Sequence, residues 1–254
     1  MQSRLRHGLA AAVVALVVAT SAVGVVSAAS PAPVAGGPAG SGPCAAPAMV
    51  ARAGATVADL RAFGGCEIDR RLTTLGQLSS IVAASKGLTP SDAAVLAGEI
   101  GADTSGLTSL KATIEGQTAI AALRAEIVEI VNKYRVYVLL GPQIRLVIAA
   151  DSVLALKPHF DQIAASLTDR IAMAQAAGKD VTSAQASLAA MNAAVTAAVA
   201  LASPLPAQLL ALTPAGLAGS AATVLQNART ALGAARDDLK SAAQDGRDVI
   251  ADLK

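Results

Sequence analysis

The chain has 254 residues, of which 54% are hydrophobic, 15% are charged and only 2% are aromatic. Its 20 basic and 18 acidic residues form no basic stripe interleaved with aromatic residues, which disfavours nucleic-acid binding. With two Tyr, two Phe and no Trp, the chain also has little from which to build the aromatic platforms of a sugar-cleaving cleft.

The first residues have the pattern of an export signal. Arg4, Arg6 and His7 precede an apolar run, and "VSAAS" supplies small residues for a signal peptidase. We therefore predict a signal peptide over residues 1–28, cleaved after Ala28, and a protein located outside the cytoplasm, either secreted or associated with the cell envelope. An uncleaved membrane anchor is the alternative. Loss of Arg4 and Arg6 with the leader would make the mature protein formally neutral.

A Pro/Gly/Ala tract over residues 29–48 follows, and its composition predicts a disordered spacer before a single domain over residues 49–254. The chain has two cysteines, Cys44 and Cys66. In an oxidising compartment an even cysteine count favours one intramolecular disulfide, which here would tie the spacer to the first helix. Pairing between two chains is the alternative.

The domain is expected to be all-α, an elongated antiparallel helical bundle with coiled-coil-like packing. Alanine dominates, and apolar residues recur at steps of three and four, the spacing at which helices pack against other helices. The periodic stretches predict helices near residues 55–85, 90–116, 119–139, 142–177, 181–202 and 217–253.

Several helix boundaries carry specific signals. Thr89 is the predicted N-cap of a helix that has Pro90 in its first position and Asp92 in its first turn. Gly178 followed by Asp180 predicts a tight turn between two antiparallel helices. The pair Gly64 and Gly65 predicts a break in the first helix, since glycine destabilises a helix interior. The apolar segment 203–217 is expected to pack on the helices.

The stretch "KYRVYVLLGPQIRLVIAAD", residues 133–151, combines both tyrosines with a Gly-Pro step. Gly141 and Pro142 predict a helix stop and restart. Tyr134 and Tyr137 fall on the apolar seam of the preceding helix, so the stretch is interpreted as an elbow in the core. A buried strand is the alternative, because "RVYVLL" alone is typical of one.

The inventory of chemical groups is sparse. His159 is the one histidine that would remain after removal of the leader, and no Gly-x-Ser-x-Gly elbow accompanies it. One histidine and a cysteine pair cannot supply an ordinary zinc site. The aspartates near the C-terminus alternate with basic residues, which is typical of a solvated helix face, with weak calcium binding as the alternative. We expect no enzymatic activity, no metal and no cofactor.

One segment approaches the length and composition of a membrane span. Residues 184–202 carry no charge, but they include Gln, Ser, Asn and Thr and are dominated by alanine, which contributes little apolar drive. A buried middle helix explains the missing charge equally well. We therefore expect no second membrane span beyond the leader.

Several segments carry a resemblance: "IDRRLTTLGQL", "SGLTSLKATI", "IVNKYRVYVLLGPQIRLVIAAD", "AAGKDVT" and the closing "DVIADLK". With the leader and spacer, they resemble secreted, alanine-rich helical proteins of unknown function from high-GC Gram-positive bacteria. The resemblance covers most of residues 55–254. It implies a helical architecture and an extracytoplasmic location, and it implies no activity and no functional residues.

These observations predict a non-enzymatic helical protein that binds a protein or cell-envelope partner or serves as a spacer. The alternative is an extracytoplasmic carrier of a small apolar ligand, with a pocket near Tyr134, Tyr137 and Arg145. The sequence does not indicate the oligomeric state.

Overall fold

A computed structural model describes residues 54–254, and every regular element in this range is a helix. The described part of the chain is therefore all-α, as its periodicity predicts. The predicted signal peptide, the predicted spacer and Cys44 lie outside the described residues. Cys66 lies in the first described helix, and its pairing with Cys44 stays a prediction.

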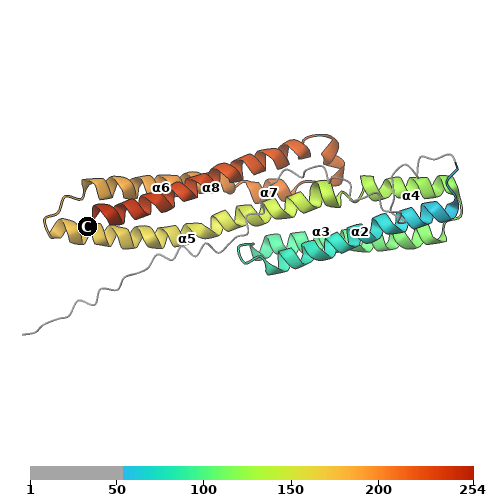
Figure 1. Cartoon of the computed structure of the whole chain (residues 1–254), viewed down its shortest axis with the longest axis horizontal. Helices are drawn as coiled ribbons and strands as arrows, with labels where there is room; N and C mark the ends of the chain where they lie inside the picture. Colours follow the sequence, from blue (N-terminus) through green and yellow to red (C-terminus); the bar gives the residue numbers. More distant parts are fainter. Residues whose placement is uncertain (1–53) are drawn as a thin grey trace, which may run out of the picture. The chain divides into compact units, whose positions relative to one another are not determined.

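The first three helices, α2 (Val57–Ala84), α3 (Pro90–Gly116) and α4 (Ile120–Asn132), pack against one another in pairs (Figure 1). Helix α2 begins with a reciprocal capping box. The backbone N–H of Asp59 donates to Thr56 Oγ1 at 3.2 Å, and the backbone N–H of Thr56 donates to Asp59 Oδ2 at 3.0 Å. Both the start of α2 and the start of α3 therefore use a threonine cap.

The predicted break at Gly64 and Gly65 is absent, and α2 runs through both residues. Gly64 is buried, and a Cβ placed on it would lie 3.1 Å from Ile114 Cδ1 and 3.3 Å from Ile127 Cγ1. The glycine is thus required for the close approach of α3 and α4, and packing outweighs its cost in a helix interior.

The elbow lies upstream of its predicted place. Helix α4 ends at Asn132, residues 133–135 leave the helix, and a π-helical turn, η1 (Val136–Leu140), leads directly into α5 (Gly141–Ala176). The expected helix over 119–139 and the expected stop at Gly141 are both wrong. The strand alternative for "RVYVLL" is wrong as well.

Gly141 and Pro142 instead support the π turn. The backbone N–H of Gly141 donates to the carbonyl oxygen of Val136, and a Cβ on Gly141 would lie 3.2 Å from that same oxygen. Pro142 has no backbone N–H. No hydrogen-bond donor is therefore left unpaired at this residue, where the chain passes from π-helical to α-helical geometry. The Gly-Pro step therefore marks a change of helix type rather than an interruption.

Helix α5 packs against α6 (Thr182–Ala202) and α8 (Ala221–Asp252), which also pack against each other (Figure 1). Segment 203–217 forms a short helix, α7 (Leu205–Leu210), and the start of a 3₁₀ turn, η2 (Pro214–Ala218). Neither element was predicted. The sequence did predict that this segment packs on the helices, and Leu205 and Leu209 are buried.

The turn between α5 and α6 has the predicted chemistry. Gly178 adopts a φ of 77°, in the left-handed region that favours glycine. Asp180 Oδ1 accepts from the backbone N–H of Thr182 at 2.9 Å. The N-cap position itself is occupied by Val181, one residue after the predicted cap.

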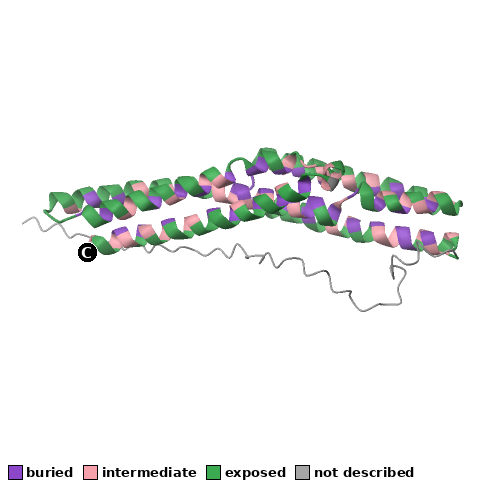
Figure 2. Cartoon of the chain, turned by 90° about the horizontal axis from the view of Figure 1, so that it is seen from above, coloured by how far each residue is buried: buried purple, intermediate pink, exposed green. Residues whose placement is uncertain are grey.

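The buried side chains form two clusters, which Figure 2 shows along the faces that the helices turn toward one another. The first cluster draws on α2, α3, α4, η1, α7 and the early turns of α5 and α8. The second draws on the later turns of α5 and α8 together with α6. Helix α5 contributes to both clusters, with Pro158 in the stretch between its buried Ala150 and Leu167.

Candidate functional site

The segment around the break holds the tyrosines singled out by the sequence, and Tyr134 is its buried member, with 5% of its surface exposed. Its ring lies against α3 at Gly106, where an added Cβ would lie 2.8 Å from Tyr134 Cε1 and 2.9 Å from Cζ. Lys133 Nζ lies 5.4 Å from the ring centroid and 3.0 Å from Glu129 Oε1. Tyr134 is thus buried on the side of α3, as predicted, and Lys133 reaches solvent.

Tyr137 is 44% exposed, so the prediction that it continues the buried seam is wrong. The physical reason is the break, because the spacing of three that aligns two residues on an α-helix fails when the chain leaves the helix between them. The guanidinium of Arg71, on α2, lies 5.2 Å from the Tyr137 ring centroid. This cation–π contact joins η1 to α2 and orients the exposed ring.

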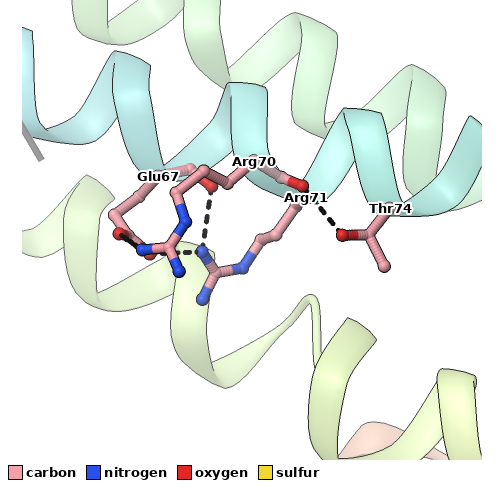
Figure 3. A network of polar contacts seen from close by, with 4 residues as sticks. All are labelled: Glu67, Arg70, Arg71 and Thr74. Atoms are coloured by element: carbon pink, nitrogen blue, oxygen red, sulfur yellow. Dashed lines mark hydrogen bonds and ion pairs between the residues drawn. The ribbon is translucent and has the colours of Figure 1, made fainter. Parts of the chain in front are cut away.

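Arg71 is itself held firmly, as Figure 3 shows. Only 6% of the residue is exposed, and Nη1 donates to the carbonyl oxygen of Glu67 at 3.0 Å and to Glu67 Oε2 at 2.8 Å. Arg70 donates to the other carboxylate oxygen at 2.9 Å, and the Thr74 hydroxyl donates to the Arg70 carbonyl oxygen at 2.9 Å. Sequence reasoning missed Arg71, although its spacing of four from Glu67 was a signal.

Large apolar side chains are exposed on both sides of the break. Val128 and Val131 on α4 are 52% and 51% exposed, and Val138 on η1 is 52% exposed. Val128 and Val131 share one face of α4, because residues three apart are neighbours on a helix. We call these three valines together with Tyr137 the break surface. Lys133 and Arg135, which lie between α4 and η1, supply its nearest positive charges in sequence.

Arg145 is exposed on α5, and the ligand pocket near Tyr134, Tyr137 and Arg145 stays a prediction. Tyr134 faces α3 and Tyr137 faces Arg71 of α2. An open groove lies elsewhere, between α5 and α6, and is lined by Thr168, Ile171, Gln185, Leu188, Ala189 and Asn192.

Polar contacts also join α3 to α5. The backbone N–H of Thr89 donates to Asp151 Oδ2 at 2.9 Å, and Gln143 Nε2 donates to Glu99 Oε2 at 3.3 Å. Asp151 and Gln143 are both 2% exposed. The two contacts run in opposite directions along the two helices, so α3 and α5 are antiparallel where they meet.

Two acidic groups at this contact, Glu99 and Asp103, have raised pKa values. Burial raises the pKa of Glu99, the neighbouring Asp103 raises it further, and the bond from Gln143 opposes the shift. Burial also raises the pKa of Asp103. None of the ion pairs between described residues involves either carboxylate. The sequence analysis assigned neither carboxylate a role.

Within residues 54–254 there is no group of three or more His, Cys, Asp and Glu side chains placed to hold a metal ion. His159 is exposed on α5. Two aspartates of α8 contact neighbours on the same helix: Asp237 forms an ion pair with Lys240 at 2.7 Å, and Asp248 accepts from Gln244 Nε2 at 2.8 Å.

Two segments of the described chain are long and apolar enough to cross a membrane by length and composition alone, Ile120–Ala176 and Thr182–Leu210. The core helices of soluble proteins pass the same criterion, so it does not separate the two cases. The absence of a second membrane span stays a prediction.

No protein-family model, no curated protein and no solved structure matches this chain.

Proposed function

We propose that this chain is a non-enzymatic helical interaction protein, exported from the cytoplasm, which binds a protein partner through the break surface. The observation that carries the proposal is the exposure of Val128, Val131, Val138 and Tyr137 beside a helix break. Exposed apolar side chains that gather in one segment are typical of interaction sites, whereas single ones are common on any surface.

The fixed orientation of the Tyr137 ring supports this role. The ring is exposed, yet the buried Arg71 lies over it and is held by Glu67. A partner that covers Tyr137 would not have to immobilise a free aromatic side chain, which lowers the entropic cost of binding. Tyrosine with a nearby arginine is also a combination enriched among residues that dominate binding energy.

The charges beside the break surface indicate the chemistry of the partner. Lys133 is 62% exposed at its side chain, and Arg135 is half-buried at the break. Lys133 is paired with Glu129 at 3.0 Å, so charges of both signs lie beside the break surface. An apolar partner surface with charges of both signs at its edge fits this arrangement, because rim charges steer association.

The proposed architecture of the described helices is an antiparallel bundle. Its support comes from paired contacts in opposite order, such as Ser187 of α6 with Asp252 of α8 at 3.3 Å. Further along, a Cβ on Gly246 would lie 3.2 Å from Met191 Sδ, so a small residue on α8 faces a large one on α6. Such alternation allows close helix approach.

Native mass spectrometry of the protein purified from its producing cells tests the proposal. We expect a complex with a second polypeptide that is lost in Val138→Asp and kept in Met173→Asp, because Met173 is 72% exposed on α5 and lies outside the break surface. A protein partner that binds both variants equally would contradict the assignment of the surface.

The carrier alternative keeps one observation in its favour, the groove between α5 and α6 with Ile171 and Leu188 in its lining. A stoichiometric small molecule in the same spectra, lost in Leu188→Gln, would establish a carrier at that groove. It would also move the function away from Tyr134, Tyr137 and Arg145.

A further inference from the structure

Two helices of this chain begin with the same sequence pattern and cap it differently. The pattern is Thr-x-x-Asp, from Thr56 to Asp59 in α2 and from Thr89 to Asp92 in α3. In α2 the aspartate accepts from the backbone N–H of its own threonine, which closes the capping box locally. The start of α3 therefore provides a direct comparison within one molecule.

In α3 the corresponding N–H is taken by another helix. The hydroxyl of Thr89 still accepts from the backbone N–H of Asp92 at 3.2 Å, as in a normal cap. The backbone N–H of Thr89, however, donates to Asp151 Oδ2 of α5 at 2.9 Å. Asp151 thus occupies the place that Asp92 would fill in a local capping box.

The displaced carboxyl group remains close by. Asp92 is near enough to raise the pKa of Asp151, and Asp151 is itself buried, with 2% of the residue exposed. Two carboxylates at one site repel each other and ionise together only at a cost, whereas one proton between them converts repulsion into a hydrogen bond.

We propose that Asp151 and Asp92 compete for the single backbone N–H of Thr89, so that uptake of one proton by the pair docks the start of α3 on α5 and its loss releases it. In the released state Asp92 closes its own capping box, as Asp59 does in α2. The contact is therefore a two-state joint with a defined alternative partner for the same donor. This inference is independent of the proposed function.

The direction in which the pKa of Asp151 is shifted agrees with this geometry. Burial raises it above its ordinary 3.8, the bond from Thr89 opposes the shift, and the neighbouring Asp92 raises it further. An acid whose pKa is higher in the docked state takes up protons on docking, so docking strengthens as pH falls from neutral toward the ordinary value of the carboxyl group.

The groups that shift the pKa of Asp151 include no basic residue. Helices α6 and α7 carry no titratable side chain, and Gly87 in the α2–α3 connection is in close contact with Ser152. Helix α2 carries no titratable side chain after Arg71, whose guanidinium lies over the Tyr137 ring, and both Lys86 and Arg229 are exposed. On α3 itself, Glu99 and Asp103 add further acidic groups on the side that meets α5.

Hydrogen exchange of the purified full chain, expressed as protection factors at pH 5 and pH 8, tests the joint. We expect protection of residues 89–96 to be higher at pH 5 than at pH 8, by at most about tenfold for each unit by which docking raises the pKa, because the full effect develops only below the ordinary carboxyl value. In Asp92→Asn the side-chain amide donates to Asp151 without a proton from solvent, so protection should be high at both pH values. In Asp151→Ala, protection of the same residues should be low at both pH values.

Asp59→Asn in α2 is the matched control, because it changes the same position of a locally closed box and should leave the pH response of residues 89–96 as in the parent. The proposal fails if the parent shows equal protection at pH 5 and pH 8. It also fails if Asp92→Asn keeps the response of the parent, an outcome that remains informative even when Asp151→Ala does not fold.

Discussion

At the scale of single residues, the buried part of the break depends on one aromatic ring and the glycine beneath it. Tyr134 is 5% exposed, and its ring occupies the position that a side chain at Gly106 would need. Because the side chains are closely packed, Gly106 is sensitive to added volume and Tyr134 is sensitive to lost volume. They also have matched neighbours on the same elements, which makes them suited to mutation.

Gly106→Ala should destabilise the protein by about 1 to 3 kcal/mol, because the added methyl group overpacks the contact with the Tyr134 ring. Gly101→Ala is the control on the same helix. It has nothing within 4 Å of its added Cβ and should stabilise the protein by about 0.5 to 1 kcal/mol. Urea unfolding of both variants measures the difference. Equal effects would mean that the ring does not contact α3 at Gly106.

Tyr134→Ala should cost on the order of 3 kcal/mol through loss of a buried ring. Lys133→Ala, at the adjacent exposed position, should leave the unfolding midpoint unchanged within error. The same denaturant experiment reports both. A Tyr134→Ala variant as stable as the parent would remove the core role of this tyrosine.

At the scale of elements, the contact between Arg71 and Tyr137 is the link between α2 and η1 that can be isolated most cleanly. A double-mutant cycle with Arg71→Met and Tyr137→Leu should show a coupling energy of about 0.5 to 1 kcal/mol, the range for a cation–π contact with a partly exposed ring. Arg71→Met keeps most of the apolar stem, so packing changes cancel in the cycle. Additive effects would show that the two groups do not interact.

The sequence predicted most elements because alanine-rich helices obey a simple periodicity, and it predicted the caps at Thr89 and the turn at Gly178 because their chemistry is local. It did not predict the π turn. The apolar spacing continues through Tyr134 and Tyr137, and only the path of the backbone shows that they face different neighbours. Helix α7 was missed because its pattern spans less than two turns of helix.

The candidate site was harder to predict than the fold. Tyr134, Tyr137 and Arg145 were grouped by their closeness in sequence, whereas the structure places them against three different surroundings. Asp151 and Arg71 acquire their roles from burial, which depends on tertiary packing. A lone acidic or basic residue in a helical pattern looks like any solvated position until its neighbours are known.

At the scale of the whole molecule, stability should depend on pH in two opposite limbs. The pKa of Glu99 and that of Asp103 are raised, so stability should increase as pH falls from neutral. Hydrogen bonds from Thr182 lower the pKa of Asp180, and that contribution should disappear as pH falls through and below the ordinary carboxyl value of 3.8. Stability is therefore expected to be highest in mild acid.

Glu99→Gln should make the upper limb of this profile shallower, and Asp180→Asn should make the lower limb shallower. Thermal unfolding recorded across the acidic and neutral range measures both. Arg170→Gln is a suitable control for loss of charge, since Arg170 lies on α5, is exposed and takes part in none of the ion pairs between described residues. A profile that falls steadily from neutral pH into acid would contradict the raised pKa values at the contact of α3 and α5.

Site-specific photo-crosslinking in the producing cells tests the central claim most directly. A photoreactive residue at Val131 or Val138, both exposed, should capture one polypeptide of constant mass. The same residue at Met173, which is more exposed, should not capture it. Capture should be lost when Tyr137→Ala is combined with the probe at Val131. Equal capture at Val131, Val138 and Met173, or capture that survives Tyr137→Ala unchanged, would contradict a partner-binding role for the break surface.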